Sequence, residues 1–297
     1  MAFGRHTPMS VEIRHTHLAV GDLSVHVAEA GDPHGPPYLF LHGWPESWST
    51  WEGVMERAAG TARVIAVDLP GIGGSTGAVP GGSKRLIAAA VHDLVGALGL
   101  TGLTLVGHDA GGMVAYSYLR QYADADRVVV MNTVIPGVEP WSEVLRNPYI
   151  WHFGFHAVPA LPEALVRDRQ AEYFAYFYDV LSPAPEKITE ESRAAHAAAY
   201  GTDAALTAGF DLYRAFPQDA RDNAELSAAG PVDTPLLYVR GDGEGGDVTA
   251  YAAGLREAGV RNLTTALIPG AGHFAQEEAP GDVWDLIHSF AATTTTT

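Results

Sequence analysis

An aspartate stands at a tight turn between an apolar run and a helix-forming run, and its neighbours are small. The stretch LTLVGHDAGGMVAY, residues 103–116, places Asp109 after Gly107 and before Gly111 and Gly112. This G-x-D-x-G spacing is typical of a strained strand-to-helix turn that exposes a nucleophile at the end of a sheet. Asp109 could instead cap the following helix, a common use of aspartate. Capping alone does not require the three glycines, so the spacing favours a nucleophile.

A carboxylate nucleophile does different chemistry from a serine. It is ionised at neutral pH, so it needs no general base, and it can attack an sp³ carbon to form an alkyl-enzyme ester. Hydrolysis of that ester requires an activated water, and hence a histidine. His273, in IPGAGHFAQEEAP, follows the last apolar run and precedes the last helical stretch. A single histidine could be structural, but this chain position is the one expected for the base.

The loop LHGWPESW, residues 41–48, is the second candidate part of the site. Its glycine and proline would turn the backbone so that the amide of Trp44 points toward the nucleophile. The amide of Ala110, directly after Asp109, would point to the same place. We predict that these two amides form an oxyanion hole for the tetrahedral intermediate of ester hydrolysis.

Six short apolar runs alternate with helical stretches and must position these residues. Each run is bounded by Gly, Pro or Asp, as parallel strands between helices are. The runs cover 37–43, 62–71, 103–109, 127–134, 235–242 and 263–270, and helices are predicted over 83–98, 111–122, 248–258 and 280–291. This alternation predicts an α/β fold with a mostly parallel, doubly wound sheet of buried strands. Residues 17–31 predict an antiparallel hairpin at one edge.

Residues 137–230 interrupt this alternation. They are rich in aromatic residues and proline, they have helical patterns, and they lack strand-like runs. We interpret them as a helical cap inserted between two strands of the core. The expected organisation is a first core part over 1–136, the cap over 137–230, and a second core part over 231–297.

These motifs resemble those of the α/β-hydrolase superfamily and, within it, the epoxide hydrolase family. The resemblance rests on GHDAG, LHGWPESW and DLPGIGGS, and it extends from about residue 37 to 290. It implies an α/β-hydrolase fold with a cap, and an Asp109 ester formed by opening an epoxide. One bacterial branch of the family opens the ring with a histidine in a WHF-like motif and a tyrosine in a YYRA-like motif. IWHFGFH and FDLYRAF match that branch, which implies His152 and Tyr213 as proton donors.

Asp109 and His273 would form a catalytic triad with a third residue, an acid that orients the histidine and stabilises its imidazolium. Relatives place this acid after the run RVVVMN or after the run PLLYVRG. The first place holds Asn132 here, whose side-chain oxygen could hold the imidazole tautomer but supplies no charge. The second offers Asp242, Glu244 and Asp247, and the family's usual spacing favours Glu244. This acidic loop could instead be a solvated turn.

The residue after the nucleophile bears on the substrate. Haloalkane dehalogenases usually carry Trp there and fluoroacetate dehalogenases Arg, whereas this sequence has Ala110. A small residue leaves room beside the nucleophile, so we expect a bulky hydrophobic or aromatic epoxide, with Trp151, Phe153 and Tyr176 lining the pocket. A hydrolytic haloacid or haloalkane dehalogenase is the alternative reaction. A small-molecule receptor built on this fold is the alternative from another class.

The composition of the 297-residue chain narrows the class of protein further. A formal charge of −17 argues against binding nucleic acid or an anionic membrane, and the absence of cysteine excludes disulfides and thiolate catalysis. The histidines show no helical metal-binding spacing, so we expect no metal or cofactor, and only an epoxide and water as partners. The first ten residues lack the apolar core of a signal peptide. We expect a cytoplasmic protein, with a homodimer as a candidate assembly and the TTTTT run as a disordered tail.

Overall fold

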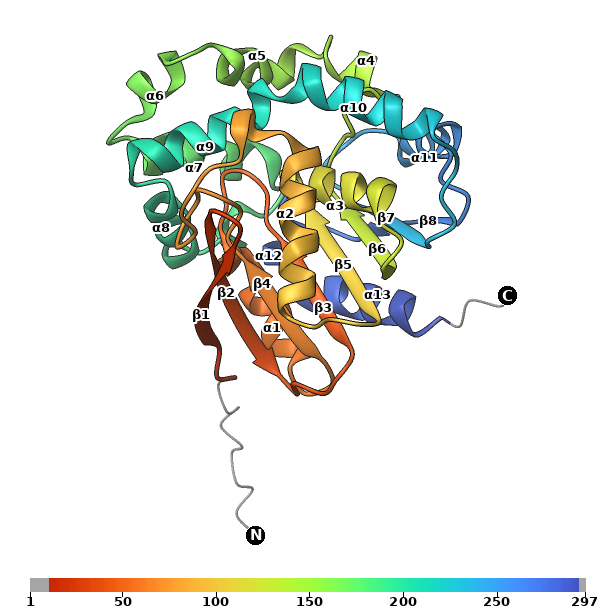
Figure 1. Ribbon diagram of the computed structural model, residues 1–297. Coiled ribbons are helices and arrows are strands. Elements are labelled where there is room, and N and C mark those ends of the chain that lie inside the picture. Colours follow the sequence, from red (N-terminus) through yellow and green to blue (C-terminus); the bar gives the residue numbers. More distant parts are fainter. Residues whose placement is uncertain (1–10, 294–297) are drawn as a thin grey trace.

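In the part of the chain that the structure describes, eight strands form one sheet in the order β1-β2-β4-β3-β5-β6-β7-β8 (Figure 1). The computed structural model describes residues 11–293. β2 pairs antiparallel with β1 and with β4, and all other neighbouring strands are parallel. The predicted α/β sheet with its antiparallel hairpin at one edge is confirmed. The strands are β1 (Arg14–Val20), β2 (Leu23–Gly31), β3 (Pro37–Leu41), β4 (Arg63–Val67), β5 (Leu103–His108), β6 (Ala125–Met131), β7 (Leu236–Gly241) and β8 (Leu263–Ile268).

The central strands are apolar along their length because helices cover both faces of the sheet. In β3, Leu39 and Leu41 belong to the apolar cluster that includes side chains of α2 (Lys84–Ala97) and α3 (Ala110–Gln121). Tyr38 and Phe40 belong to the cluster on the other face, with side chains of α1 (Glu52–Ala58) and α13 (Pro280–Ala292). Successive side chains of a strand point to opposite faces, so a strand covered on both sides shows no polar alternation.

The core helices connect these strands, and four of them match the predicted helices within one residue at each end. They are α2 (Lys84–Ala97), α3 (Ala110–Gln121), α11 (Val248–Glu257) and α13 (Pro280–Ala292). The short helices α1 (Glu52–Ala58) and α12 (Ala275–Glu278) and the 3₁₀ turns η1 (Trp48–Trp51) and η2 (Pro80–Gly82) were not predicted. One or two helical turns are too short for a helical hydrophobic period to show in the sequence.

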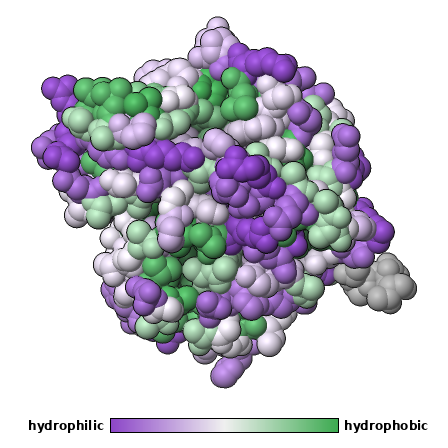
Figure 2. All heavy atoms as spheres, turned by 45° about the horizontal axis from the view of Figure 1, so that its top comes forward, coloured by the Kyte–Doolittle hydropathy of each residue, from purple (hydrophilic) through white to green (hydrophobic). Residues whose placement is uncertain are grey.

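The segment between β6 and β7 is helical and lies above the sheet in Figure 1. We call residues 137–230 the cap. Many large apolar side chains are exposed on it, and Figure 2 shows apolar patches on this side of the molecule. Its helices are α4 (Trp141–Val144), α5 (Trp151–Ala157), α6 (Leu161–Val166), α7 (Gln170–Leu181), α8 (Glu190–Ala199), α9 (Asp203–Arg214) and α10 (Phe216–Ala228), with the 3₁₀ turns η3 (Pro148–Ile150) and η4 (Pro185–Lys187).

The prediction that all six runs are buried strands is wrong for β8. It pairs only with β7, at the edge of the sheet, and Thr264, Thr265 and Leu267 are exposed. Between residues 11 and 293, no helix combines the length and the apolar character needed to cross a membrane. The last four threonines of the predicted tail lie outside the described residues.

Candidate active site

Asp109 occupies the turn between β5 and α3 with a φ of 48° and a ψ of −118°. A positive φ at a residue with a side chain costs about 1–3 kcal/mol and persists where the surroundings impose it, often at a functional site. The Asp109 side chain makes no capping hydrogen bond to α3. Its Oδ1 instead accepts a hydrogen bond from the amide of Trp44 at 2.9 Å. The capping alternative is therefore wrong for this carboxylate.

The glycines around Asp109 are required by close approach of the backbone. A Cβ at Gly107 would lie 2.1 Å from the carbonyl oxygen of Gly111, and one at Gly111 would lie 2.4 Å from the carbonyl oxygen of Leu41. A Cβ at Gly43 would lie 2.4 Å from Cβ of Asp109. A larger residue at Gly107 would push β5 away from the start of α3, and one at Gly43 or Gly111 would separate the turn at Asp109 (the elbow) from the loop 41–48 (the Trp44 loop). The glycine spacing in the sequence reflects this tight packing.

His273 lies beside Asp109 and contacts Glu244. Its Nδ1 is 2.7 Å from Oε1 of Glu244, and its Nε2 is 3.9 Å from Oδ2 of Asp109. A carboxylate can only accept, so Nδ1 carries the proton and Nε2 keeps its lone pair. Because 3.9 Å exceeds a hydrogen bond, that lone pair is free on the side of Asp109. The imidazole has the tautomer that a general base needs.

Three donors converge on the carboxylate of Glu244. Oε1 accepts from His273, while Oε2 accepts from Nδ2 of Asn132 at 2.8 Å and faces Nη2 of Arg240 at 3.0 Å. Burial by itself would raise the pKa of Glu244, but the Arg240 guanidinium and these hydrogen bonds outweigh burial and lower it. Glu244 is therefore ionised at neutral pH and can stabilise a charged imidazole.

The other candidate acids do not contact His273. Asn132 donates its amide to Glu244 and to the carbonyl of Gly272, while its side-chain oxygen has no hydrogen-bond partner among the described residues. The expectation that this oxygen could hold the imidazole is therefore wrong. Asp242 accepts from the amide of Gly270 at 2.7 Å, and Asp247 caps α11. Loop geometry separates these carboxylates, although they lie within six residues of one another.

The backbone of His273 is fixed from two sides. Its amide donates to the carbonyl of Leu181, at the end of cap helix α7, and its carbonyl lies 2.7 Å from Nε2 of His108. The other ring nitrogen of His108 lies 2.8 Å from Oε2 of Glu46. Both partners can only accept, so both nitrogens of this buried ring donate and it is an imidazolium. Burial alone would lower the pKa of His108, but the Glu46 carboxylate raises it to about 9.

A cavity of about 280 Å³ lies between the sheet and the cap, and Asp109 and His273 line it. The predicted donors Tyr213, on α9, and His152, on α5, line the same cavity, as does Phe153. Burial and the charge of Asp109 raise the pKa of Tyr213 well above its usual value, so its phenol stays protonated. Burial and nearby His273 lower the pKa of His152 to about 3. At neutral pH both side chains are uncharged and carry a proton that they can donate.

Two predicted pocket residues lie elsewhere. Trp151 and Tyr176 are 43% and 45% exposed on the outside of the cap, where the indole N–H faces the Tyr176 hydroxyl at 3.4 Å. Neither lines the cavity. On α7 the wall is formed instead by Phe177 and Leu181, one turn apart. The aromatic residues of AEYFAYFYD spread over more than half of the helix circumference, so the sequence could not indicate which of them faces inward.

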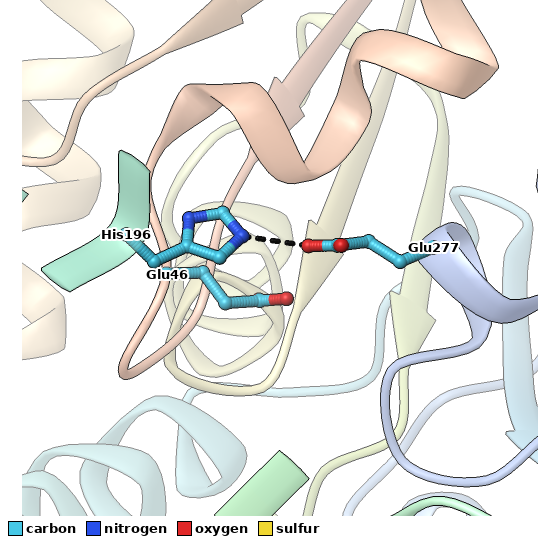
Figure 3. A group of neighbouring side chains, drawn as sticks. All are labelled: Glu46, His196 and Glu277. Atoms are coloured by element: carbon cyan, nitrogen blue, oxygen red, sulfur yellow. Dashed lines mark hydrogen bonds and ion pairs between the residues drawn. The ribbon is translucent and has the colours of Figure 1, made fainter. Parts of the chain in front are cut away.

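The described residues include one group with the side-chain types of a metal site. Ligand atoms of Glu46, His196 and Glu277 lie within 4.8 Å of one another (Figure 3). The amide of Ser47 donates to Nδ1 of His196 at 3.2 Å, so the ring proton lies on Nε2, which donates to Oε1 of Glu277 at 2.6 Å. A histidine that binds metal through Nε2 keeps its proton on Nδ1. The Ser47 amide opposes that tautomer, so His196 and Glu277 are arranged as a hydrogen-bonded pair and not as metal ligands.

Comparison with known proteins agrees with this geometry. The model of the alpha/beta hydrolase fold family matches residues 36–280, well over half of the chain. The chain belongs to the α/β-hydrolase fold family. In this α/β-hydrolase, Asp109 stands where the fold exposes its nucleophile, at the turn between a strand and the helix that follows it.

Relatives of this α/β-hydrolase include proteins named for one reaction. The soluble epoxide hydrolase of Corynebacterium sp. (strain C12) is 29% identical over 290 residues, covering 96% of this chain and 99% of the relative. Among solved structures, Cfl2 from Burkholderia cenocepacia has a TM-score of 0.85 at 31% identity and covers 94% of this chain and 95% of its own. The epoxide hydrolase CorEH has a TM-score of 0.83 at 26% identity, covering 95% of this chain and 99% of its own.

Proposed function

We propose that this α/β-hydrolase is an epoxide hydrolase that converts an epoxide into a vicinal diol through an ester on Asp109. The observation that carries the proposal is that a carboxylate nucleophile, a histidine base and two uncharged proton donors line one cavity. Relatives named epoxide hydrolases, aligned over almost the whole chain, add support. The division into two core parts and a cap over 137–230 is part of the same proposal.

In the first step, Oδ2 of Asp109 attacks an epoxide carbon, because Oδ1 is engaged by the Trp44 amide. The C–O bond of the ring breaks, and its electron pair goes to the ring oxygen. Tyr213 gives its proton to this alkoxide, while His152 donates a hydrogen bond. A phenol can supply this proton at neutral pH, whereas a departing halide would need none. Ala110, in place of a tryptophan or arginine donor, also favours the epoxide.

In the second step, His273 takes a proton from water, and the resulting hydroxide attacks the ester carbonyl carbon. The amides of Trp44 and Ala110 hold the oxyanion; the first N–H groups of a helix have no partner within it, which leaves that of Ala110 free. Glu244 stabilises the imidazolium. Collapse breaks the ester bond, and His273 returns its proton to the departing alkoxide. The second proton of the attacking water remains on the Asp109 carboxyl group, and its transfer to Tyr213 replaces the proton that Tyr213 lost in the first step.

We infer a bulky, hydrophobic or aromatic substrate. Much of the cavity wall is apolar, formed by side chains that include Met113, Val134, Phe153, Phe177 and Leu181. Ala110 adds no bulk beside the nucleophile. Higher kcat/KM for aryl epoxides than for small aliphatic epoxides is expected, and the reverse order contradicts this substrate class.

The test is to trap the ester in His273→Gln, which cannot activate water. Intact mass is measured after incubation with styrene oxide, other aryl epoxides and haloacids. The expected result is a stable increase in protein mass equal to the mass of the whole epoxide and mapped to Asp109. An increase equal to the haloacid without its halogen, seen with haloacids alone, indicates a dehalogenase. No gain with any compound contradicts the proposal and favours a receptor.

A further inference from the structure

The loop that follows the oxyanion donor Trp44 is held by side chains of the cap. Tyr178, on α7, donates its hydroxyl to the carbonyl of Pro45 at 3.2 Å. Tyr200, directly after α8, donates its hydroxyl to the carbonyl of Glu46 at 3.0 Å. These two carbonyls lie outside any helix or strand, so no regular backbone ladder supplies their hydrogen bonds.

The next residue of the loop makes a third contact of this kind. The amide of Ser47 donates to Nδ1 of His196, on cap helix α8. The other ring nitrogen of His196 donates to Glu277 on α12, four residues after the proposed base (Figure 3). Three consecutive backbone groups are therefore each bound by a different cap side chain. We call these side chains the clamp: Tyr178, Tyr200 and His196.

Burial makes each clamp contact costly to lose. The three side chains are at most 1% exposed, and the aromatic ring of Trp44 packs among aromatic side chains of the cap, including Phe174 and Phe177. A buried carbonyl that loses its donor bears a desolvation cost of about 1–3 kcal/mol. We expect the loop to relieve this cost by moving, which would displace the neighbouring Trp44 amide from Oδ1 of Asp109.

We propose that the clamp positions the Trp44 amide for hydrolysis of the Asp109 ester, so that the cap acts on the second step as well as on ring opening. This inference rests on the proposed function. In the first step the carboxylate loses its charge, so the hydrogen bond from Trp44 weakens as the ester forms. In the second step charge develops on the same oxygen, so the bond strengthens. Only an interaction that strengthens in the transition state accelerates a step.

The experiment removes one hydroxyl at a time with Tyr178→Phe and Tyr200→Phe, and then combines the two. Rapid-quench mass measurements with styrene oxide give separate rate constants for ester formation and ester hydrolysis. Complete loss of an oxyanion donor costs about 10²–10³-fold, and displacement costs less. Hydrolysis in the double variant should slow about 5- to 50-fold, with ester formation within about twofold of wild type. Because ester accumulates, kcat and KM fall together while kcat/KM stays nearly constant.

Tyr173→Phe is the matched control. Its hydroxyl lies 2.7 Å from Nε2 of His156, within the cap, and phenylalanine keeps the ring that packs edge-on against Trp44. This variant removes a cap hydrogen bond of the same kind, and the ratio of the two rate constants should not change. His196→Gln is a further clamp variant for which slower hydrolysis is expected. Melting temperatures show which variants are folded, and the single variants suffice if the double variant is not.

The outcomes separate the two proposals. Ester in the wild type with selectively slower hydrolysis in the clamp variants supports the clamp. Ester in the wild type with both steps unchanged, or both slowed equally, overturns the clamp and leaves the epoxide hydrolase intact. No ester in wild type or His273→Gln overturns the proposed function, and the clamp with it.

Discussion

Replacing Glu244 by glutamine tests whether the hydrogen bond from His273 to Glu244 sets the tautomer of the base. The two oxygens of Glu244 accept from opposite sides: Oε1 from His273, and Oε2 from Asn132 and from Arg240. A glutamine has one oxygen and one NH₂ group. Two donors, one of them charged, face the Oε2 side and only one faces Oε1. We therefore expect the glutamine oxygen to turn toward Arg240 and its NH₂ toward His273.

This orientation forces the wrong tautomer on His273. An NH₂ group facing Nδ1 requires Nδ1 to accept, so the proton moves to Nε2 and the base loses its lone pair. In a serine triad the equivalent exchange lowers kcat about 10⁴-fold, which corresponds to about 5.5 kcal/mol of barrier. We expect hydrolysis of the Asp109 ester to slow about 10³- to 10⁴-fold. Ester formation needs no base and should change by less than about fivefold.

Rapid-quench mass spectrometry with an aryl epoxide follows both steps. The expected result for Glu244→Gln is one equivalent of ester formed quickly and lost slowly. Asp242→Asn is the matched control on the same loop. Within residues 11–293 the Asp242 carboxylate bonds only to the Gly270 amide, so its replacement should not affect either step. Turnover of Glu244→Gln within tenfold of wild type, or equal losses in the two variants, refutes this account of the triad.

Three further predictions concern protons. Tyr213→Phe removes the proton donor and should slow ester formation about 10²- to 10⁴-fold, with hydrolysis of any ester nearly unchanged; the reverse pattern in single-turnover measurements contradicts its role. Asn132→Asp puts a second carboxylate about 3 Å from Glu244, so one pKa of the pair should rise. The acidic side of the pH profile of kcat should therefore move to higher pH. An unchanged profile argues against Glu244 as the acid of the triad. The folded-state pKa of His108 is raised to about 9, so the stabilisation from its charged form is complete below about pH 6.5 and is lost as pH rises through about 9. Urea denaturation between pH 6 and 9.5 should show the free energy of unfolding falling with pH. The fall should be smaller in His108→Gln.

The sequence predicted the sheet and the residues at its functional edge because those signals are local. A strand covered on both faces must be apolar throughout, and this was visible in five of the six runs. The edge strand β8 has equally β-branched residues, and only its position in the sheet exposes them. The elbow at Asp109 could be predicted because close backbone approach excludes any Cβ at positions 107 and 111, so only glycine fits there and the sequence shows it.

Contacts between distant segments were decided by the tertiary structure alone. The resemblance to the family favoured Glu244, but the residue types of Asp242, Glu244 and Asp247 do not distinguish them. Which carboxylate meets His273 depends on how two loops 29 residues apart come together. Arg240, which helps to ionise Glu244, carries no motif.

By itself, the sequence determined the periodicities and glycine positions that specify a doubly wound sheet with a carboxylate at its strand–helix elbow. Folding decided which cap aromatics face inward: Phe153 lines the cavity, while Trp151 and Tyr176 lie outside. It also brought Tyr178, Tyr200 and His196 onto the Trp44 loop. The physical reason is that periodicity and glycine constraints act between neighbours in the chain. Hydrogen bonds and ion pairs depend on distances in space, which exist only once the cap has packed on the sheet.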